Sequence, residues 1–474
     1  MRSPVDGAPQ AQSTTPAPAP SAGGRALAPD QAARWFVLSA VVWFLVAGAV
    51  GLVLAAFLYT PNVQSFIPEA WRGPLNFGRL RPLHVNVLLF GWLSMLYAAA
   101  FLYLTPRLTS TPLWSERLAR WTCLLWNLLM LGAVVSLPLG FTQGREYAEL
   151  VWPLDLLQTA LFLMLALNLW GTVLRRRELR LYISVWNFMA ASLIMALVYA
   201  FGNKIWDPSG AYAGMNDAIV NYFYVHNLFN VWFTTGGLGI ALYLIPRLSG
   251  NPLFSHRLAI WGFASVWAGQ HHLLYAPGPD WLEFVSIAFS ILAAIPNTAF
   301  GVNFVMTMRG AWHRLQHDVP LAWVATGASM YLLTCAQGVA QSFRDFNLLV
   351  HFTNWVIGHS HLVFVGAYSA YGFALVYHLL GRIDGARFDP RLQWWHYGLT
   401  MGGLWVFLLT LWAAGLIQGQ NWATGELPFL ATVRSLQPYH LVRLLAGLIM
   451  AAGQLVFVYQ VWQAFRGRAS SEAA

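Results

Sequence analysis

Charged residues are scarce in this chain. Lys, Arg, Asp and Glu together make up 9% of the 474 residues, whereas 58% are hydrophobic. Soluble domains carry roughly a quarter charged residues, so most of this surface is expected to face lipid. The formal net charge of +9 could suggest a nucleic-acid partner. The basic residues lie in short loops between apolar runs, however, which membrane topology explains better, and no nucleic-acid partner is expected.

Cysteine is almost absent, and this excludes several kinds of site. The only two cysteines, Cys123 and Cys335, both lie inside apolar runs. A disulfide framework and a cysteine-rich metal site are therefore excluded, and without a CxxCH motif the chain does not attach a c-type haem itself. Residues 1–30 are rich in Pro, Ala, Gly and Ser and lack the apolar core of a signal peptide, which predicts a disordered tail.

Long apolar runs fill the rest of the sequence. A membrane-spanning helix needs about 20 such residues, and twelve runs of this length follow one another. The sequence predicts an all-α polytopic membrane protein with twelve transmembrane helices over 31–468 and a short tail over 469–474. The predicted spans are 33–59, 80–104, 118–141, 153–174, 181–202, 221–245, 257–276, 282–308, 320–341, 352–380, 395–417 and 440–465.

Basic residues predict the orientation of these spans. They gather in the loops that follow even-numbered spans, for example at 175–180 after the fourth. Because basic loops remain in the cytoplasm, both termini are predicted to be cytoplasmic.

Six histidines fall near the outer ends of four predicted spans, at one depth. A single buried histidine is usually a hydrogen-bonded core residue or a proton relay. Six at a common level indicate metal binding, because neutral imidazole is a good ligand for Fe, Cu and Zn. The six are His84, His226, His271, His272, His359 and His361.

The spacing of these histidines suggests how they divide. Residues two apart on a helix point about 200° away from each other, so His359 and His361 can hold two planar cofactors on opposite sides of one span. His84 is then left to pair with one face of this span. The arrangement predicts one iron between two histidines and one five-coordinate iron.

The other three histidines suit a single metal ion. His271 and His272 diverge by about 100° on a helix, and near a helix end they can converge on one ion. His226 on the preceding span would complete a three-imidazole site facing the open position of the five-coordinate iron. The remaining histidines are predicted to have ordinary loop or helix-end roles: His256, His313, His317, His378, His396 and His440.

Five stretches carry a resemblance to a known family: RPLHVN (81–86), REYAELVWPLD (145–155), VHNLF (225–229), GQHHLLYAPGPDW (269–281) and HFTNWVIGHSHL (351–362). The chain resembles subunit I of the haem-copper oxidase superfamily, nearest to the cbb3-type oxidases and the related nitric oxide reductases. The resemblance implies two b-type haems and one copper or non-haem iron. His84 and His361 would ligate the low-spin haem, His359 the high-spin haem, and His226, His271 and His272 the third metal.

The resemblance also implies partners and a location. The chain would be the catalytic subunit of a respiratory enzyme in a bacterial inner membrane, surrounded by lipid. A cytochrome c-type subunit would donate electrons, and the substrate would be a small gas, NO or O2.

Two departures from the family pattern bear on the substrate. Oxidases of the cbb3 type carry a redox-active tyrosine where this chain has Ser265, and other oxidases carry one where it has Asn230. Splitting O2 needs four electrons at once, whereas joining two NO molecules needs two and no phenol donor. The resemblance therefore predicts reduction of nitric oxide to nitrous oxide. The alternative is a cbb3-type cytochrome c oxidase with a relocated donor, for which Tyr222, one helical turn before His226, is the candidate.

Asn230 also affects the identity of the third metal. Typical nitric oxide reductases have a glutamate there, on the same helical face as the histidine, as an additional iron ligand. Three imidazoles alone suit copper, and three imidazoles with an oxygen donor suit iron. Asn230 is included as a catalytic candidate, and the metal stays open between copper and iron.

Four charged residues are further candidates. Arg79 and Arg81 flank His84 on the outer side, against the positive-inside trend, and haem propionates would explain them. Glu146 and Glu149 could share one face if their segment is helical. In the family, glutamates of this stretch lie near a calcium ion and the haem propionates, so both are candidate metal or propionate-region residues.

Two other classes of membrane protein also use buried histidines. A proton-coupled membrane transporter could use histidines as relays, but it should show broken helices and repeat symmetry. A membrane zinc hydrolase would explain three histidines but neither the HxH pair nor His84.

Overall fold

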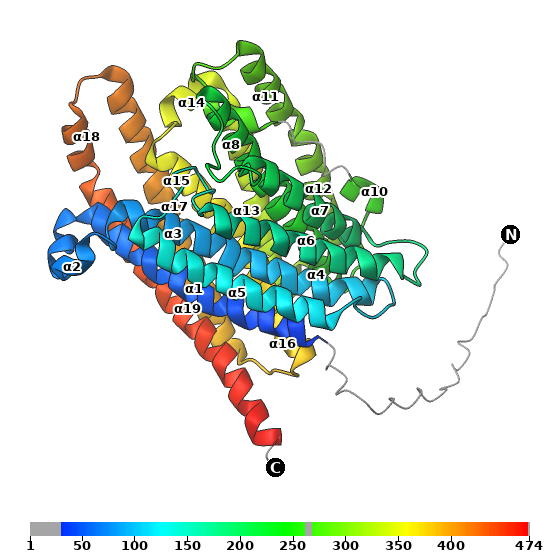
Figure 1. The fold of residues 1–474 in the computed structure, drawn as a ribbon. Coiled ribbons are helices and arrows are strands. Elements are labelled where there is room, and N and C mark those ends of the chain that lie inside the picture. Colours follow the sequence, from blue (N-terminus) through cyan, green and yellow to red (C-terminus); the bar gives the residue numbers. More distant parts are fainter. Residues whose placement is uncertain (1–29, 261–267, 473–474) are drawn as a thin grey trace, which may run out of the picture.

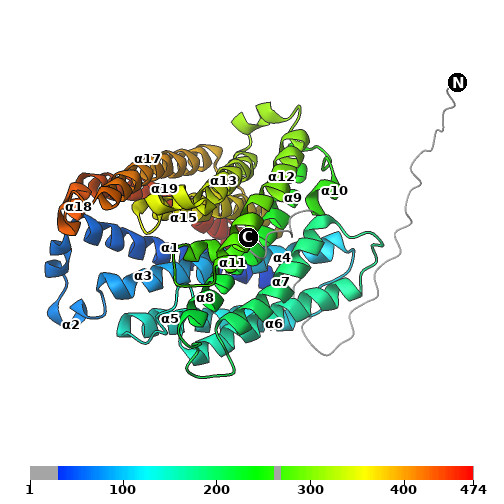
Figure 2. The same ribbon diagram turned by 90° about the horizontal axis from the view of Figure 1, so that it is seen from above.

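The computed structural model describes residues 30–260 and 268–472, and all regular elements in these ranges are helical (Figures 1 and 2). Eleven helices of the described chain are long and apolar enough to cross a membrane, and they coincide with eleven of the twelve predicted spans. The predicted seventh span, 257–276, lies partly outside the described residues; its described parts are α10 (His256–Ala259) and the 3-10 helix η5 (Ala268–Leu273).

Eight of the eleven spans contain no π-helical segment: α1 (Gln31–Tyr59), α5 (Glu116–Leu139), α6 (Trp152–Leu174), α7 (Ile183–Gly202), α11 and α12 together (Asp280–Leu292 and Ala294–Thr307), α13 (Val319–Ser342), α17 (Pro390–Thr424) and α19 (Gln437–Glu472). Because α19 continues to Glu472, helix extends past 469, where the C-terminal tail is predicted to begin. Short helices connect the spans: η1 (Pro61–Phe66), α2 (Glu69–Arg72), η6 (Trp312–Gln316), α14 (Arg344–Val350) and α18 (Phe429–Ser435).

The other three spans each change from α-helix to π-helix within three residues after a candidate histidine. His84 lies near the end of α3 (Phe77–Asn86), His226 near the end of α8 (Met215–Asn227), and His361 at the end of α15 (Asn354–His361). π-Helical turns are rare and are found mostly at functional sites. The π segments and the helices that follow them are η2 (Val87–Leu93) and α4 (Ser94–Leu108), η3 (Leu228–Thr235) and α9 (Gly236–Ser249), and η7 (Leu362–Ser369) and α16 (Ala370–Ile383).

Side-chain caps fix several helix starts. Ser115, Asp318 and Asp389 each accept a hydrogen bond from a backbone N–H in the first turn of α5, α13 and α17. Such a cap satisfies one of the four N–H groups that a helix start leaves unpaired. Pro320 and Pro390 stand in the first turn, where a missing N–H costs nothing.

Five helices surround the region between His84 and His361. α1 packs against α3 and α19, and α17 packs against α15 and α19. Figure 2 shows this group on one side of the bundle, with α5, α6 and α7 on another.

Glycines allow α17 to approach α14 and α15 closely. A Cβ on Gly415 would overlap the backbone nitrogen of Trp355, and one on Gly419 would overlap the carbonyl oxygen of Leu349. On the facing helix, a Cβ on Gly358 would lie 2.8 Å from the ring of Trp412. Small residues at a helix contact let two backbones come close, and here they position the helix that carries His359 and His361.

Replacing Gly415 by alanine should therefore destabilise the protein. We expect a cost of about 1–3 kcal/mol from overpacking, seen as a lower midpoint of thermal unfolding in detergent. Gly398→Ala is the matched control, because it lies on the same helix with open space around its Cβ position. The control should leave the midpoint unchanged or raise it, since alanine is the better helix former. Equal midpoints for the two variants would contradict the close approach.

Candidate metal and haem sites

Three histidines converge on one point between α8 and η5. Nitrogen atoms of His226, His271 and His272 all lie within 4.8 Å of one another, and the Nε2 atoms of the last two are 3.1 Å apart. The ring centroid of His226 lies 5.2 Å from that of His271. Among the described residues, no Asp, Glu or Cys belongs to this three-histidine cluster. Three imidazole nitrogens at this separation suit one Cu, Zn or Fe ion.

The surroundings orient these rings. Ser290 on α11 donates its hydroxyl proton to the carbonyl oxygen of Ser286. The hydroxyl oxygen of Ser290 therefore accepts the proton on Nδ1 of His271, at 2.7 Å. Nε2 of His271 is then unprotonated, with its lone pair available to a metal at the three-histidine cluster. A Cβ on Gly269 would lie 3.0 Å from the Tyr222 carbonyl oxygen, so glycine lets η5 sit against α8. The ring of Tyr222 stacks on that of His272, with centroids 5.4 Å apart.

His359 and His361 face different helices, as their spacing predicts. Nδ1 of His359 lies 3.1 Å from Oε1 of Gln337 on α13, whereas the ring of His361 lies 4.7 Å from that of Phe407 on α17. Since the amide oxygen only accepts, Nδ1 of His359 carries the proton and Nε2 is free to bind a metal.

A cavity of about 480 Å³ separates His84 from His361. Nδ1 of His84 is 2.8 Å from the Ala47 carbonyl oxygen, and Nδ1 of His361 is 2.8 Å from that of Ile357. Each carbonyl accepts the Nδ1 proton, so both rings keep an Nε2 lone pair for a ligand.

Glycine shapes the α1 wall of this cavity. A Cβ on Gly51 would lie 2.8 Å from Cε1 of His84, and Gly48, which also lines the cavity, leaves open space where a Cβ would be. The cavity lined by both imidazoles has room for a planar cofactor, and His84 and His361 are the residues that would bind the iron of a haem there.

The sequence prediction missed two residues of this cavity. His440 was predicted to have an ordinary helix-end role, but it lines the cavity together with Arg443 on α19. The available signal was an arginine inside a predicted span, since intramembrane charges usually mark a functional site. His351 stacks on Phe352, which also lines the cavity, with centroids 3.9 Å apart.

The two arginines that precede His84 in sequence, Arg79 and Arg81, differ in position. Arg81 lines the cavity and forms an ion pair with Glu146, with Nη2 and Oε1 2.6 Å apart. Arg79 does not line it; its Nη1 donates to the Pro138 carbonyl oxygen at 2.9 Å. The prediction that Arg79 contacts a propionate of a haem in this cavity therefore finds no support in its geometry.

The segment with Glu146 and Glu149 is not helical, so the two do not share a helical face. A bridge between Arg145 and Ala148 closes a turn there. Glu146 pairs with Arg81, whereas Glu149 is 3% exposed and accepts a hydrogen bond from Nδ2 of Asn86 at 2.9 Å. Burial raises the pKa of the Glu149 carboxyl to about 7; the hydrogen bond opposes this shift and the nearby Glu146 adds to it.

The structure also bears on the two positions used to predict the substrate. Ser265 lies outside the described residues. Asn230 lies in the π-helical segment η3, which begins two residues after His226. The carbonyl oxygen of Asn230 accepts a hydrogen bond from Thr235 at 3.0 Å.

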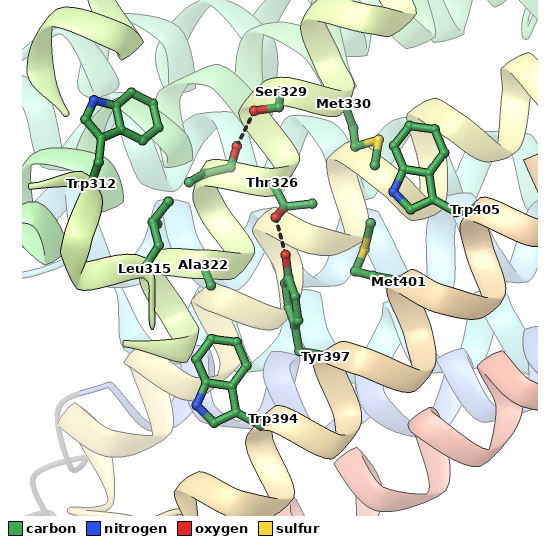
Figure 3. Close-up of a pocket in the computed structure, with 11 residues that line it drawn as sticks. Trp312, Leu315, Ala322, Thr326, Ser329, Met330, Trp394, Tyr397, Met401 and Trp405 are labelled. Carbon is green, nitrogen blue, oxygen red and sulfur yellow. Dashed lines mark hydrogen bonds between the residues drawn. The ribbon is translucent and has the colours of Figure 1, made fainter. Parts of the chain in front are cut away.

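A second pocket, of about 340 Å³, lies away from these histidines between η6, α13 and α17 (Figure 3). Trp312, Trp394 and Trp405 surround it, and a hydrogen bond of 2.7 Å joins Thr326 to Tyr397. No histidine, cysteine or carboxylate lines it. It therefore offers no strong metal ligand.

Comparison with known proteins identifies the family. The family model "Cytochrome C and Quinol oxidase polypeptide I" matches residues 31–449. The chain belongs to this family. A member from Stutzerimonas stutzeri, the cbb3-type cytochrome c oxidase subunit CcoN1, is 32% identical over 457 residues, which cover 93% of this chain and 95% of that protein. Cytochrome c oxidase subunit 1 of Rhodobacter capsulatus is 30% identical over 454 residues, covering 91% and 85%.

A solved structure of a heme-copper terminal oxidase dimer shares the fold. Its TM-score is 0.75 at 15% identity, covering 92% of this chain and 84% of that one. The predicted all-α fold and membership of the haem-copper oxidase superfamily are thus confirmed, and the family implies haem and copper as cofactors. This family is neither a transporter family nor a zinc-hydrolase family, so both alternatives are wrong. The names of the relatives do not support the predicted preference for nitric oxide, because they are cytochrome c oxidases.

The buried carboxyl of Glu149 should make stability depend on pH. The folded protein holds this proton up to about pH 7, whereas the unfolded chain loses it near the ordinary value of 4.5. Stability should therefore fall as pH rises from 4.5 to 7, by roughly 3 kcal/mol at most. In Glu149→Gln, the midpoint of thermal unfolding should fall less as pH rises from 4.5 to 7. The measurement is made in EDTA, so that no bound cation masks the titration of this carboxyl. An identical slope in both proteins would show that Glu149 does not titrate there.

Proposed function

We propose that this chain is the catalytic subunit of a cbb3-type cytochrome c oxidase, which reduces oxygen to water in a bacterial inner membrane. The observation that carries the proposal is the convergence of His226, His271 and His272 without a carboxylate in the group. A purely imidazole donor set suits copper better than iron. Similarity over nine-tenths of the chain to cytochrome c oxidase subunits supports it.

The histidines of α15 would connect two haem irons. His361 and His84 would hold a low-spin haem in the cavity, and His359 would hold a high-spin haem on the other side of the helix, toward α13. The haems and the copper would supply electron storage and the site of oxygen reduction. The protein's own contribution is orientation: Ala47, Ile357 and Gln337 fix the ring tautomers.

Electrons would come from a cytochrome c-type partner, because the chain carries no c-haem motif of its own. Four electrons and four protons then convert one O2 into two water molecules. If a phenol supplies one electron and one proton, Tyr222 is the candidate in the described chain, since its ring stacks on His272.

Nitric oxide reduction is the second candidate, and one observation favours it. Neither Ser265 nor Asn230 supplies the phenol that oxidases of this family carry at these positions. Two NO molecules, two electrons and two protons give N2O and water, and that reaction needs no phenol donor.

Turnover with each gas distinguishes the two candidates. The purified complex with one electron donor should consume O2 faster than it consumes NO under anaerobic conditions. We expect Tyr222→Phe to lower O2 turnover at least tenfold, with the haem spectrum unchanged. If the wild type consumes NO faster than O2, and Tyr222→Phe leaves the rate of NO consumption unchanged, the second candidate is favoured and the proposal is contradicted.

Loss of one imidazole should release the metal but not the haems. In His271→Asn, we expect elemental analysis to show the copper content of the complex lowered by one per chain, with the two-haem spectrum retained. His313→Asn is the matched control, because this histidine is exposed and outside the group. Iron in place of copper in the wild type, beyond the haem iron, would instead support the nitric oxide candidate.

A further inference from the structure

The pocket shown in Figure 3 is a groove between facing sides of α13 and α17, which we call the α13–α17 groove. Four of its residues follow one another on α17 at spacings of three, four and four, which places them on one helical face: Trp394, Tyr397, Met401 and Trp405. Ser329 lines the groove from α13. Because Ser329 and Trp405 are both exposed, the groove opens onto the surface of the bundle.

The hydroxyl groups of the groove are already paired. Those of Thr326 and Tyr397 bond to each other across the two helices at 2.7 Å, and Ser329 donates to the carbonyl oxygen of Ala325 at 3.0 Å. The other lining side chains are indoles, thioethers and aliphatic groups. The surface offered to a ligand therefore suits a hydrocarbon chain, which needs no hydrogen bonds.

The length of the groove matches one leaflet of a membrane. From Trp394 to Trp405, α17 rises about 16 Å at 1.5 Å per residue. The hydrocarbon core of a bilayer is about 30 Å thick, so one leaflet supplies about half of that depth. A transmembrane helix of another protein would run along the whole thickness. A groove of half this length fits an acyl chain better.

Basic residues surround the end of the groove near the starts of α13 and α17. The segments 309–318 and 387–391, which lead into these helices, contain four arginines and two carboxylates. The carboxylates belong to Asp318 and Asp389, and each caps a helix start. Arg391 lies one turn before Trp394 on the same face of α17. It is exposed and forms no ion pair with a described residue.

We propose that the α13–α17 groove binds an acyl chain of an anionic phospholipid, and that Arg391 pairs with the headgroup of this lipid. Indole rings are favoured at the level of lipid headgroups, where Trp312 and Trp394 would lie beside the start of the chain. Arginines near the membrane surface attract anionic lipids, and the guanidinium can donate two hydrogen bonds to a phosphate. The site is separate from the haem and metal sites, so the inference does not depend on which gas is reduced.

The test is the binding of phospholipid to the purified, delipidated complex, followed by native mass spectrometry. The probes are phosphatidylglycerol, which is anionic, and phosphatidylcholine with the same acyl chains, which has no net charge. The wild type should bind one phosphatidylglycerol per chain at least about fivefold more tightly than phosphatidylcholine.

An indole in the groove should block this binding. Ser329→Trp fills the groove from its open side, and it should abolish the tight binding of phosphatidylglycerol. Leu409→Trp is the matched control, because it adds an indole at an exposed position of α17 outside the groove. The control should bind phosphatidylglycerol as the wild type does.

Loss of the charge should weaken binding of the anionic lipid selectively. Arg391→Gln should lower the affinity for phosphatidylglycerol about fivefold and that for phosphatidylcholine less. Arg434→Gln is the matched control, since this arginine is exposed on α18, beyond the opposite end of α17, and both affinities should stay unchanged.

Three results would overturn the proposal. Equal binding of phosphatidylglycerol by Ser329→Trp and the wild type would place the lipid elsewhere. Equal affinities for the two lipids, or no effect of Arg391→Gln, would show that the headgroup charge is not recognised. A polypeptide that co-purifies with the wild type and is lost from Ser329→Trp would show that a partner helix occupies the groove. If Ser329→Trp does not fold, Arg391→Gln still decides, because it leaves the lining of the groove unchanged.

Discussion

Two histidines separated by one residue on α15 determine how the rest of the site can be arranged. A helix turns about 200° over two residues, so His359 and His361 must face different neighbours. The first points toward Gln337 on α13, and the second borders the cavity beside α17. Two metal centres held by these histidines would share one helix, and the helix diameter would set their separation.

The packing around α15 keeps this arrangement in place. Glycines of α17 allow close contact at Trp355 and Leu349, and a glycine of α15 accommodates Trp412. Three spans also pass from α- to π-helix within three residues after His84, His226 and His361. A π segment changes the direction of the side chains that follow it, so each histidine is oriented by the α-helical part before the π segment, and the helix after it packs in a different register.

Much of the fold could be predicted because its cause is local. The length of apolar runs located eleven spans with ends at most seven residues from those of the structure, and the HxH and HH spacings indicated which histidines diverge and which converge. The π segments have no comparable signal, since their apolar composition matches that of α-helix. The predicted same-face relation of His226 and Asn230 assumed α-helix throughout, whereas η3 begins between the two residues. The turn at Glu146 and Glu149 depends on Arg81 and Asn86, which are distant in sequence. His440 and Arg443 reach the cavity only through the packing of α19 on α1 and α17.

The central claim is that this single chain holds two haems with different ligation and one further metal. The most direct measurement is the haem and metal content of the purified complex, combined with low-temperature spin-state spectroscopy of His361→Leu and His359→Leu. The account predicts one low-spin haem b, one high-spin haem b and one copper per chain, with the low-spin signal lost only in the first variant and the high-spin signal only in the second. One haem b per chain, or loss of the same signal in both variants, would contradict it.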